Sequence, residues 1–290
     1  MDCVTQFRQA MEGAFGTIDW LPTADSMIHR FHVSGDKAGT LNGWYLLFAD
    51  GIASGCFGSW KDAGSWHSWT SREPVDQLEA QLIRQRIEQA KRQREVEQHQ
   101  RQQATAEYAN RVWRDARRAD PEHPYLTDKG TQAHGLRQSG DVLLVPLYYE
   151  GQLVNLQRIA PDGGKRFLYG GMIKGCYSPL GIIALGQPLY VCEGWATGAT
   201  IHAETGHAVA CAMNAGNLLP VGQRLQRQHP DAVLIMTGDD DRQTEGNPGR
   251  TAANKAAVML GCGVVFPPWP DDAPLTLTDF NDLANWRVAQ

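Results

Sequence analysis

Short apolar runs alternate with amphipathic segments through the last third of the chain. The runs read PLYVC, HAVACAM, AVLIM and VVF, and the segments WATGATIHAE, LLPVGQRLQRQH and GRTAANKAAVML between them have helical spacing. Strands that are apolar along their whole length are buried on both faces, and helical crossovers make such strands parallel. The pattern predicts an α/β domain with a mostly parallel sheet over residues 186–290.

A segment with a different rhythm precedes this domain. The stretch DVLLVPLYYEGQLVNLQRI predicts two strands joined at Glu150-Gly151. A glycine-rich loop that carries Lys165 and Arg166 follows these strands. We expect residues 121–185 to form a small, basic α+β subdomain.

Residues 72–120 are rich in Gln, Arg, Glu and Ala, and they predict a long, largely solvated helix. Near its start, Leu78, Leu82 and Ile87 form a weak apolar stripe. At its far end, four residues have the spacing of a docking face: Tyr108, Val112, Trp113 and Ala116.

Residues 1–71 are rich in Trp and Gly and contain short alternating runs. The stretch GWYLLFADGIASGCFGSW predicts a hairpin that turns near Asp50-Gly51. We expect a β-rich module here.

Composition limits the class of protein more than its chemistry. The chain has 290 residues, 42% of them hydrophobic, and a net charge of -5, which is typical of a globular protein of about two domains. The sequence contains neither an apolar run of membrane-spanning length nor the pattern of a signal peptide, so we expect a cytoplasmic protein with no membrane partner. The six cysteines are scattered without a C-x-x-C pair, and we expect neither disulfides nor zinc.

Acidic residues follow two of the predicted parallel strands. Glu193 comes directly after PLYVC, and the run Asp239-Asp240-Asp241 comes after AVLIM. Ligands of open parallel sheets bind beyond the carboxyl ends of the strands, where these acids should meet. Helix capping explains any one of them equally well, but several carboxylates at one edge favour a Mg²⁺ or Mn²⁺ site.

These residues resemble a known family. The order Glu193-Gly194-x-x-Thr197-Gly198, then Asp239-x-Asp241, then Gly249 before a helix, resembles the Toprim domain of primases, topoisomerases and some nucleases. The stretch LLVPLYYEGQLVNLQRIAPDGGKRFLYGG is similar to the segment that precedes Toprim in bacterial replicative primases. The D-F-N-D sequence at Asp279–Asp282 resembles the end of Toprim in phage and plasmid primases, and GDKAGTLNGWYLLFADGIASGCFGSWK resembles a module found ahead of such domains in mobile-element primases.

The resemblance implies a Rossmann-like Toprim fold and roles for individual residues. Glu193 matches the Toprim glutamate, a general acid/base or metal-positioning group, and Asp239 and Asp241 match the pair that holds Mg²⁺. Asp240 takes the variable middle position and is expected to be dispensable. Asp279 and Asp282 are expected to supply a second-metal or outer position. Basic residues are expected to face the acids and bind the triphosphate: Arg158, Lys165 and Arg166, with Lys255 as a further candidate.

The implied activity is that of a phage- or plasmid-type DNA primase, which makes short RNA primers on single-stranded DNA from ribonucleoside triphosphates. With no P-loop in the sequence, we expect the helicase to be a separate protein. Four tryptophans of residues 1–71 either stack on bases or form a core: Trp44, Trp60, Trp66 and Trp69. The long helix is a spacer, a dimerising coil or a DNA-contacting arm. A Toprim nuclease and a non-catalytic, nucleic-acid-binding accessory protein stay open as alternatives.

Overall fold

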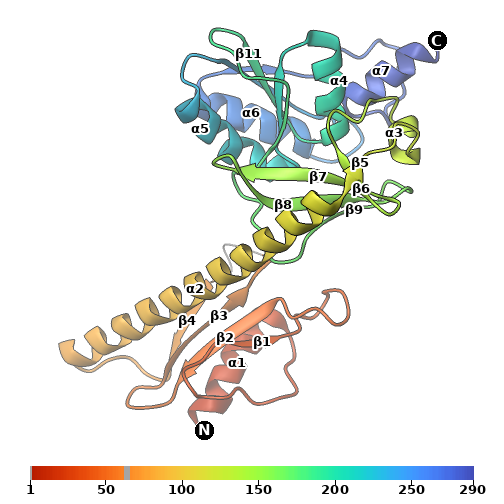
Figure 1. Ribbon diagram of the computed structural model, residues 1–290. Helices are drawn as coiled ribbons and strands as arrows, with labels where there is room; N and C mark the ends of the chain where they lie inside the picture. Colours follow the sequence, from red (N-terminus) through yellow and green to blue (C-terminus); the bar gives the residue numbers. More distant parts are fainter. Residues whose placement is uncertain (1, 62–65) are drawn as a thin grey trace. The chain divides into compact units, whose positions relative to one another are not determined.

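The computed structural model describes residues 2–61 and 66–290 and forms two compact units, residues 1–100 and 101–290 (Figure 1). The division falls inside the long helix α2 (Gln77–Asp115). None of the helices described is both long and apolar enough to span a membrane. The finer division at residues 71, 120 and 185 stays a prediction.

The first unit is an antiparallel sheet with a helix packed on it. Its strands follow chain order: β1 (His29–Phe31), β2 (Gly43–Phe48), β3 (Ser54–Ser59) and β4 (Trp66–Thr70). The β2–β3 turn contains Asp50-Gly51, as the sequence predicts. Helix α1 (Cys3–Phe15) was not predicted; Asp2 caps it by accepting a hydrogen bond from the Thr5 amide at 2.9 Å, and Phe7 and Met11 bury one face.

The tryptophans of this unit belong to its cores. Trp44 is fully buried, and Trp60 and Trp66 pack against it. The Arg94 guanidinium lies 4.8 Å from the centre of the Trp60 ring, a cation–π contact between α2 and the sheet. Trp69 lies in the other core of the unit, 5.3 Å from Phe7 between ring centres. The structure therefore favours the core interpretation over base stacking.

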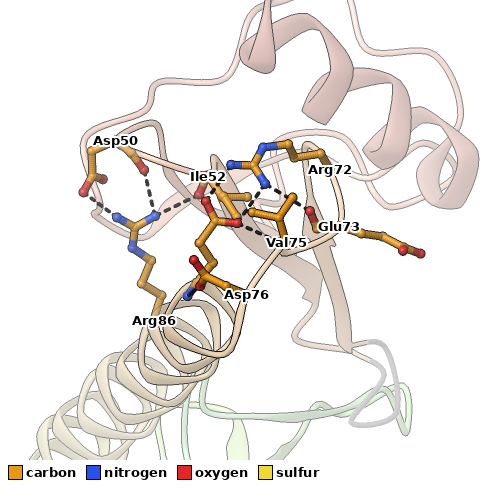
Figure 2. Close-up of polar contacts among 8 residues, drawn as sticks. Asp50, Ile52, Arg72, Glu73, Val75, Asp76 and Arg86 are labelled. Carbon is orange, nitrogen blue, oxygen red and sulfur yellow. Dashed lines mark hydrogen bonds and ion pairs between the residues drawn. The ribbon is translucent and has the colours of Figure 1, made fainter.

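The buried Arg86 connects the start of α2 to the β2–β3 hairpin (Figure 2). Arg86 donates hydrogen bonds of 2.9 Å to the carbonyls of Asp50 and Ile52, and it pairs with the Asp50 carboxylate. Leu78 is 75% exposed and Leu82 is also exposed, so the predicted apolar stripe was wrong at both positions.

Reciprocal side-chain caps begin α2 close to this contact (Figure 2). The Asp76 carboxylate accepts from the Glu79 amide at 2.8 Å, and the Glu79 carboxylate accepts from the Val75 amide at 2.9 Å. Arg72 adds two hydrogen bonds to Glu79.

The second unit contains two five-stranded sheets. One is antiparallel, in the order β5 (Arg117–Arg118), β6 (Arg137–Ser139), β7 (Val142–Tyr149), β8 (Gln152–Ile159) and β9 (Lys165–Phe167). The other has the order β10 (Ser178–Leu180), β12 (Ala208–Cys211), β11 (Pro188–Cys192), β13 (Val233–Thr237) and β14 (Gly263–Val265). In the second sheet only β10 is antiparallel to its neighbour. The mixed α/β class and the mostly parallel sheet are thus confirmed.

Helices connect the strands of the mostly parallel sheet (Figure 1). They are α4 (Trp195–Thr205), the short η1 (Ala215–Asn217), α5 (Leu218–Gln228) and α6 (Pro248–Leu260), and a further helix, α7 (Phe280–Val288), follows β14. A short helix, α3 (Pro124–Asp128), lies between β5 and β6 of the antiparallel sheet. Two buried clusters fill the space around the mostly parallel sheet, one towards α5 and α6 and the other towards α4 and the antiparallel sheet.

The two faces of the antiparallel sheet pack against different partners. Leu143 and Ile159, which are opposite each other in the β7–β8 ladder, belong to the core shared with α4. Leu144 and Leu156 belong to a separate core with Ala109 of α2. Because side chains alternate across a sheet, each residue of β8 and β9 is assigned to one face by its ladder partner.

Candidate functional site

The acidic residues that the sequence singles out lie at the carboxyl ends of adjacent strands. Glu193 directly follows β11 and Asp239 closely follows β13, and these two strands are parallel neighbours. The backbone around Glu193 is fixed by its carbonyl, which accepts from the Met213 amide at 2.7 Å. Adjacent strand ends thus bring acids that are distant in sequence to one rim.

Burial and like charge act together on these acids. Burial, followed by the charges of Asp279, Glu193 and Asp241, raises the pKa of Asp239 to about 8. Burial also raises the pKa of Glu193, with Asp241 and Asp279 adding to the shift and a hydrogen bond from the Ala215 amide opposing it. The acids are therefore close enough to disfavour one another's charge.

One oxygen at this rim lacks a partner. Asp239 Oδ1 is buried and accepts no hydrogen bond from any described residue. An unpaired buried carboxylate oxygen is costly, and a cation is the partner that would offset both this cost and the repulsion. Within residues 2–61 and 66–290, however, no three His, Cys, Asp or Glu side chains converge closely enough to hold a metal ion as they stand.

Asp279 and Asp282 begin helix α7. Asp279 is the N-cap; its Oδ1 accepts from the Asp282 amide at 2.8 Å and its Oδ2 accepts from the Thr197 hydroxyl at 2.8 Å. The Asp282 carboxylate accepts from the Thr278 amide at 3.0 Å. Burial and the charge of Asp282 raise the pKa of Asp279. Both acids border the rim, and both have structural hydrogen bonds there.

Two lysines face the acids from the antiparallel half of the unit. Lys165 pairs with Ile159 in the ladder and so lies on the face towards α4. Burial and the nearby Lys129 lower the pKa of Lys165, while Asp279, Asp239 and Glu193 oppose that shift. Lys129 Nζ lies 3.6 Å from Asp282 Oδ1. The sequence analysis missed Lys129, because a single lysine after a five-residue helix carries no local signal.

Arg158 and Arg166 lie on the other face of the antiparallel sheet. They are opposite each other in the β8–β9 ladder, and Arg158 is also opposite Leu144, which packs towards α2. Both arginines line a pocket of about 460 Å³ with Phe167. The structure does not bring them to the acidic rim with Lys165.

Lys255 lies on the exposed side of α6. Helical spacing puts it on the same face as the exposed Thr251 and Val258, whereas Ala253 and Ala256 are buried against the sheet. The structure therefore does not group Lys255 with the acids.

Comparisons with known proteins show what the chain is similar to. The Toprim domain family matches residues 188–287. Two proteins named DNA primase TraC, both from Escherichia coli, are each 34% identical to the chain: one in an alignment of 278 residues that covers 89% of this chain, and the other in an alignment of 268 residues that covers 85%. The chain spans only 19% and 24% of the length of these two relatives.

A solved structure shows a weaker likeness. It contains the bacteriophage T7 lagging-strand DNA polymerase with primase domains of two gp4 subunits, an RNA/DNA hybrid and dTTP. The match has a TM-score of 0.41 and 16% identity, and it covers 56% of this chain and 85% of the other. Residues 188–287 are a Toprim domain, in a chain that is similar in sequence to two DNA primases.

Proposed function

We propose that the protein is a metal-dependent DNA primase of phage or plasmid type, which makes short RNA primers on single-stranded DNA from ribonucleoside triphosphates. The observation that carries the proposal is the rim where Glu193 and Asp239 share a buried, mutually repulsive environment with Asp241 while Lys165 faces them. The similarity to DNA primases supports the choice of nucleotidyl transfer among Toprim activities.

The acids fit a divalent cation. The unpartnered Asp239 Oδ1 and the raised pKa values of Asp239 and Glu193 are the features of a site that a cation would stabilise. We assign Mg²⁺ or Mn²⁺ to Asp239 and Asp241, with Glu193 beside them at the same rim; ligation requires these side chains to rearrange, because the described side chains do not converge on a metal-binding geometry as they stand. A bound divalent ion would neutralise charge on the triphosphate and on the attacking oxygen. The carboxylates of Asp279 and Asp282 accept hydrogen bonds at the start of α7, and we propose that they act from a position outside the inner ligands of the cation.

The residues of this chain have distinct parts in the reaction. In primer extension a 3′ oxygen attacks the α-phosphorus of the incoming nucleotide, and pyrophosphate leaves as the P–O bond breaks. Glu193, whose pKa is raised, is suited to accept the proton of the 3′ hydroxyl. Lys165 places a cation opposite the acids, where it can bind a phosphate of the nucleotide.

Arg158 and Arg166 are proposed to bind nucleic acid instead of the reacting phosphate. Two arginines directly opposite in a ladder repel each other, and a phosphate between them would remove that repulsion. The exposed ring of Tyr169 beside their pocket offers a surface on which a base can stack.

A primer-synthesis assay tests the proposal. Labelled ribonucleotides are incubated with short single-stranded templates and Mg²⁺ or Mn²⁺, using wild type, D239A, D241A and the exposed-surface control D272A. We expect products from wild type and D272A only, with a loss of at least about a hundredfold in the two site variants. Unchanged synthesis by D239A and D241A would refute the roles given to these acids. Nicking of plasmid DNA without primer formation would identify a Toprim nuclease instead, and cation binding without either activity would identify an accessory protein.

A further inference from the structure

Asp240, the middle acid of the run, is buried with defined partners. Asp240 is only 7% exposed. Its Oδ1 accepts a hydrogen bond from Asn247 Nδ2 at 2.7 Å and lies 3.0 Å from Arg250 Nη1. Its own amide donates to the Thr278 carbonyl at 2.7 Å, just before the Asp279 cap. An acid at a variable, dispensable position would be expected to point into solvent.

The orientation of the Asn247 amide depends on Asp240. A carboxylate only accepts hydrogen bonds, so the NH₂ group of Asn247 has to face Asp240. The Asn247 oxygen is thereby left facing backbone donors, and it accepts from the Asp241 amide at 2.9 Å and from the Arg250 amide at 3.3 Å. Asn247 itself has a φ of 40°, a left-handed conformation that asparagine tolerates better than most residues.

The same contacts fix both ends of Asp241. Its amide is held by Asn247, and its Oδ2 accepts from the Gly249 amide at 3.1 Å at the start of α6. A Cβ on Gly249 would lie 2.8 Å from the Asp239 carbonyl and 3.0 Å from Asp241 Oδ2, so only glycine allows this approach. The loop that carries both candidate ligands is thus packed against the helix that Asn247 caps.

Arg250 supports Asp240 from the other side. Its guanidinium lies 4.1 Å from the centre of the Phe266 ring, and Phe266 packs closely over Gly238 at the base of the same loop. Asp240 is thus connected through Arg250 and Phe266 to Gly238, the residue before Asp239.

We propose that Asp240 is a positioning residue that orients Asn247 and thereby holds Asp239 and Asp241 in the geometry that binds a divalent cation. The inference rests on the proposed function because it concerns the same acids. Asp240 has no contact with substrate in this proposal, and its effect passes through the Asn247 amide.

Binding of Mn²⁺ alone, measured by calorimetry, is the main test. Partners of metal ligands change metal affinity by about 10- to 100-fold when removed, so we expect D240A and N247A each to weaken Mn²⁺ binding about tenfold or more. D240N retains an oxygen that can accept from Asn247 and Arg250, and we expect it to bind within about threefold of wild type. The surface variant D272A is the matched control for loss of one negative charge.

Two further measurements separate positioning from a general loss of stability. Because both variants break one relay, the double variant D240A/N247A should bind Mn²⁺ no more weakly than either single variant. The Asp241 amide should exchange its hydrogen faster in D240A while the melting temperature shifts by only a few degrees, since Arg250 is 44% exposed and can be hydrated once its partner is gone.

The outcomes are distinct. Wild-type affinity for Mn²⁺ in folded D240A and N247A, or no Mn²⁺ binding by the wild type, would overturn the positioning role. If D240A does not fold, N247A decides alone, because it leaves the Asp240–Arg250 pair in place. If the wild type binds Mn²⁺ and D240A binds it more weakly, but the wild type makes no primers, the proposed function is refuted and the positioning role of Asp240 stands.

Discussion

The repulsion among the rim acids predicts how the stability of the metal-free protein depends on pH. Asp239 has a pKa of about 8 in the folded protein, against 3.8 for the free side chain. Between these values the folded state holds a proton that the unfolded state has released, so the free energy of unfolding falls as pH rises. Each pH unit in this window costs about 1.4 kcal/mol, so Asp239 should contribute a loss of about 4 kcal/mol between pH 5 and pH 8.

Replacing Asp239 by asparagine removes this titration and keeps the size of the side chain. We expect D239N, in chelator, to lose less stability than wild type between pH 5 and pH 8, with the two profiles diverging towards high pH. Urea unfolding followed by circular dichroism at each pH measures the difference, and D272N serves as the control for a lost surface charge. Parallel profiles for wild type and D239N would show that Asp239 is not in the environment described here. Added Mg²⁺ should stabilise wild type at pH 8 and have little effect on D239N.

Three other substitutions test separate parts of the structure. R86A should lower the free energy of unfolding of the first unit by about 3 kcal/mol, because two carbonyls of the β2–β3 turn lose a charged donor. Urea unfolding measures the change, and a loss below about 1 kcal/mol would contradict the stabilising role of Arg86. Arg72 is the main cause that lowers the pKa of Glu79 to about 2, so Glu79 should stabilise this unit above about pH 4.5 and lose that contribution as pH falls towards 2. E79Q should lack this acid-dependent loss of stability. An acid-unfolding profile of E79Q identical to that of wild type would contradict the role given to the Arg72–Glu79 pair. G198A would put a Cβ 2.3 Å from Cys211 Sγ under the rim. We therefore expect the variant to be destabilised by about 2 kcal/mol or more and to make fewer primers. A melting curve identical to that of wild type would show that the core can adapt to the added methyl group.

The sequence predicts the mostly parallel sheet well because each strand there is a continuous apolar run. The strands of PLYVC and AVLIM are β11 and β13, and the helix expected from Gly249 is α6. The turn at Glu150-Gly151 also forms between β7 and β8, where both residues have positive φ, 50° and 75°. Local pattern and burial point the same way in these elements.

Elements whose signals depend on distant packing were harder to predict. Helix α1 has only Phe7 and Met11 as fully buried residues, which is too short a periodic pattern to distinguish from a loop. On α2, Leu78 and Leu82 are exposed while Arg86 is buried, because the carbonyls of the hairpin turn accept its hydrogen bonds. Composition alone cannot show that an arginine will be the buried side chain.

The candidate site was predictable to the extent that it depends on strand ends. Parallel strands bring Glu193 and Asp239 to one edge by topology alone. Which basic residues face them depends on ladder register, and this sets Lys165 apart from Arg158 and Arg166. The role of a neighbouring acid such as Asp240 depends on hydrogen-bond partners that no spacing rule specifies.

The turn between β8 and β9 has a consequence for protein engineering. It is closed by hydrogen bonds between Ala160 and Gly164 and from the Gly163 amide to the Ala160 carbonyl, and Gly163 has a φ of 81°. Adding or deleting a single residue in this turn would invert the alternation of β9 and present Arg166, in place of Lys165, to the acids. The length of a five-residue loop therefore determines which cation faces the acidic rim, and loop-length variants would present a guanidinium there in place of an ammonium without any substitution in β9.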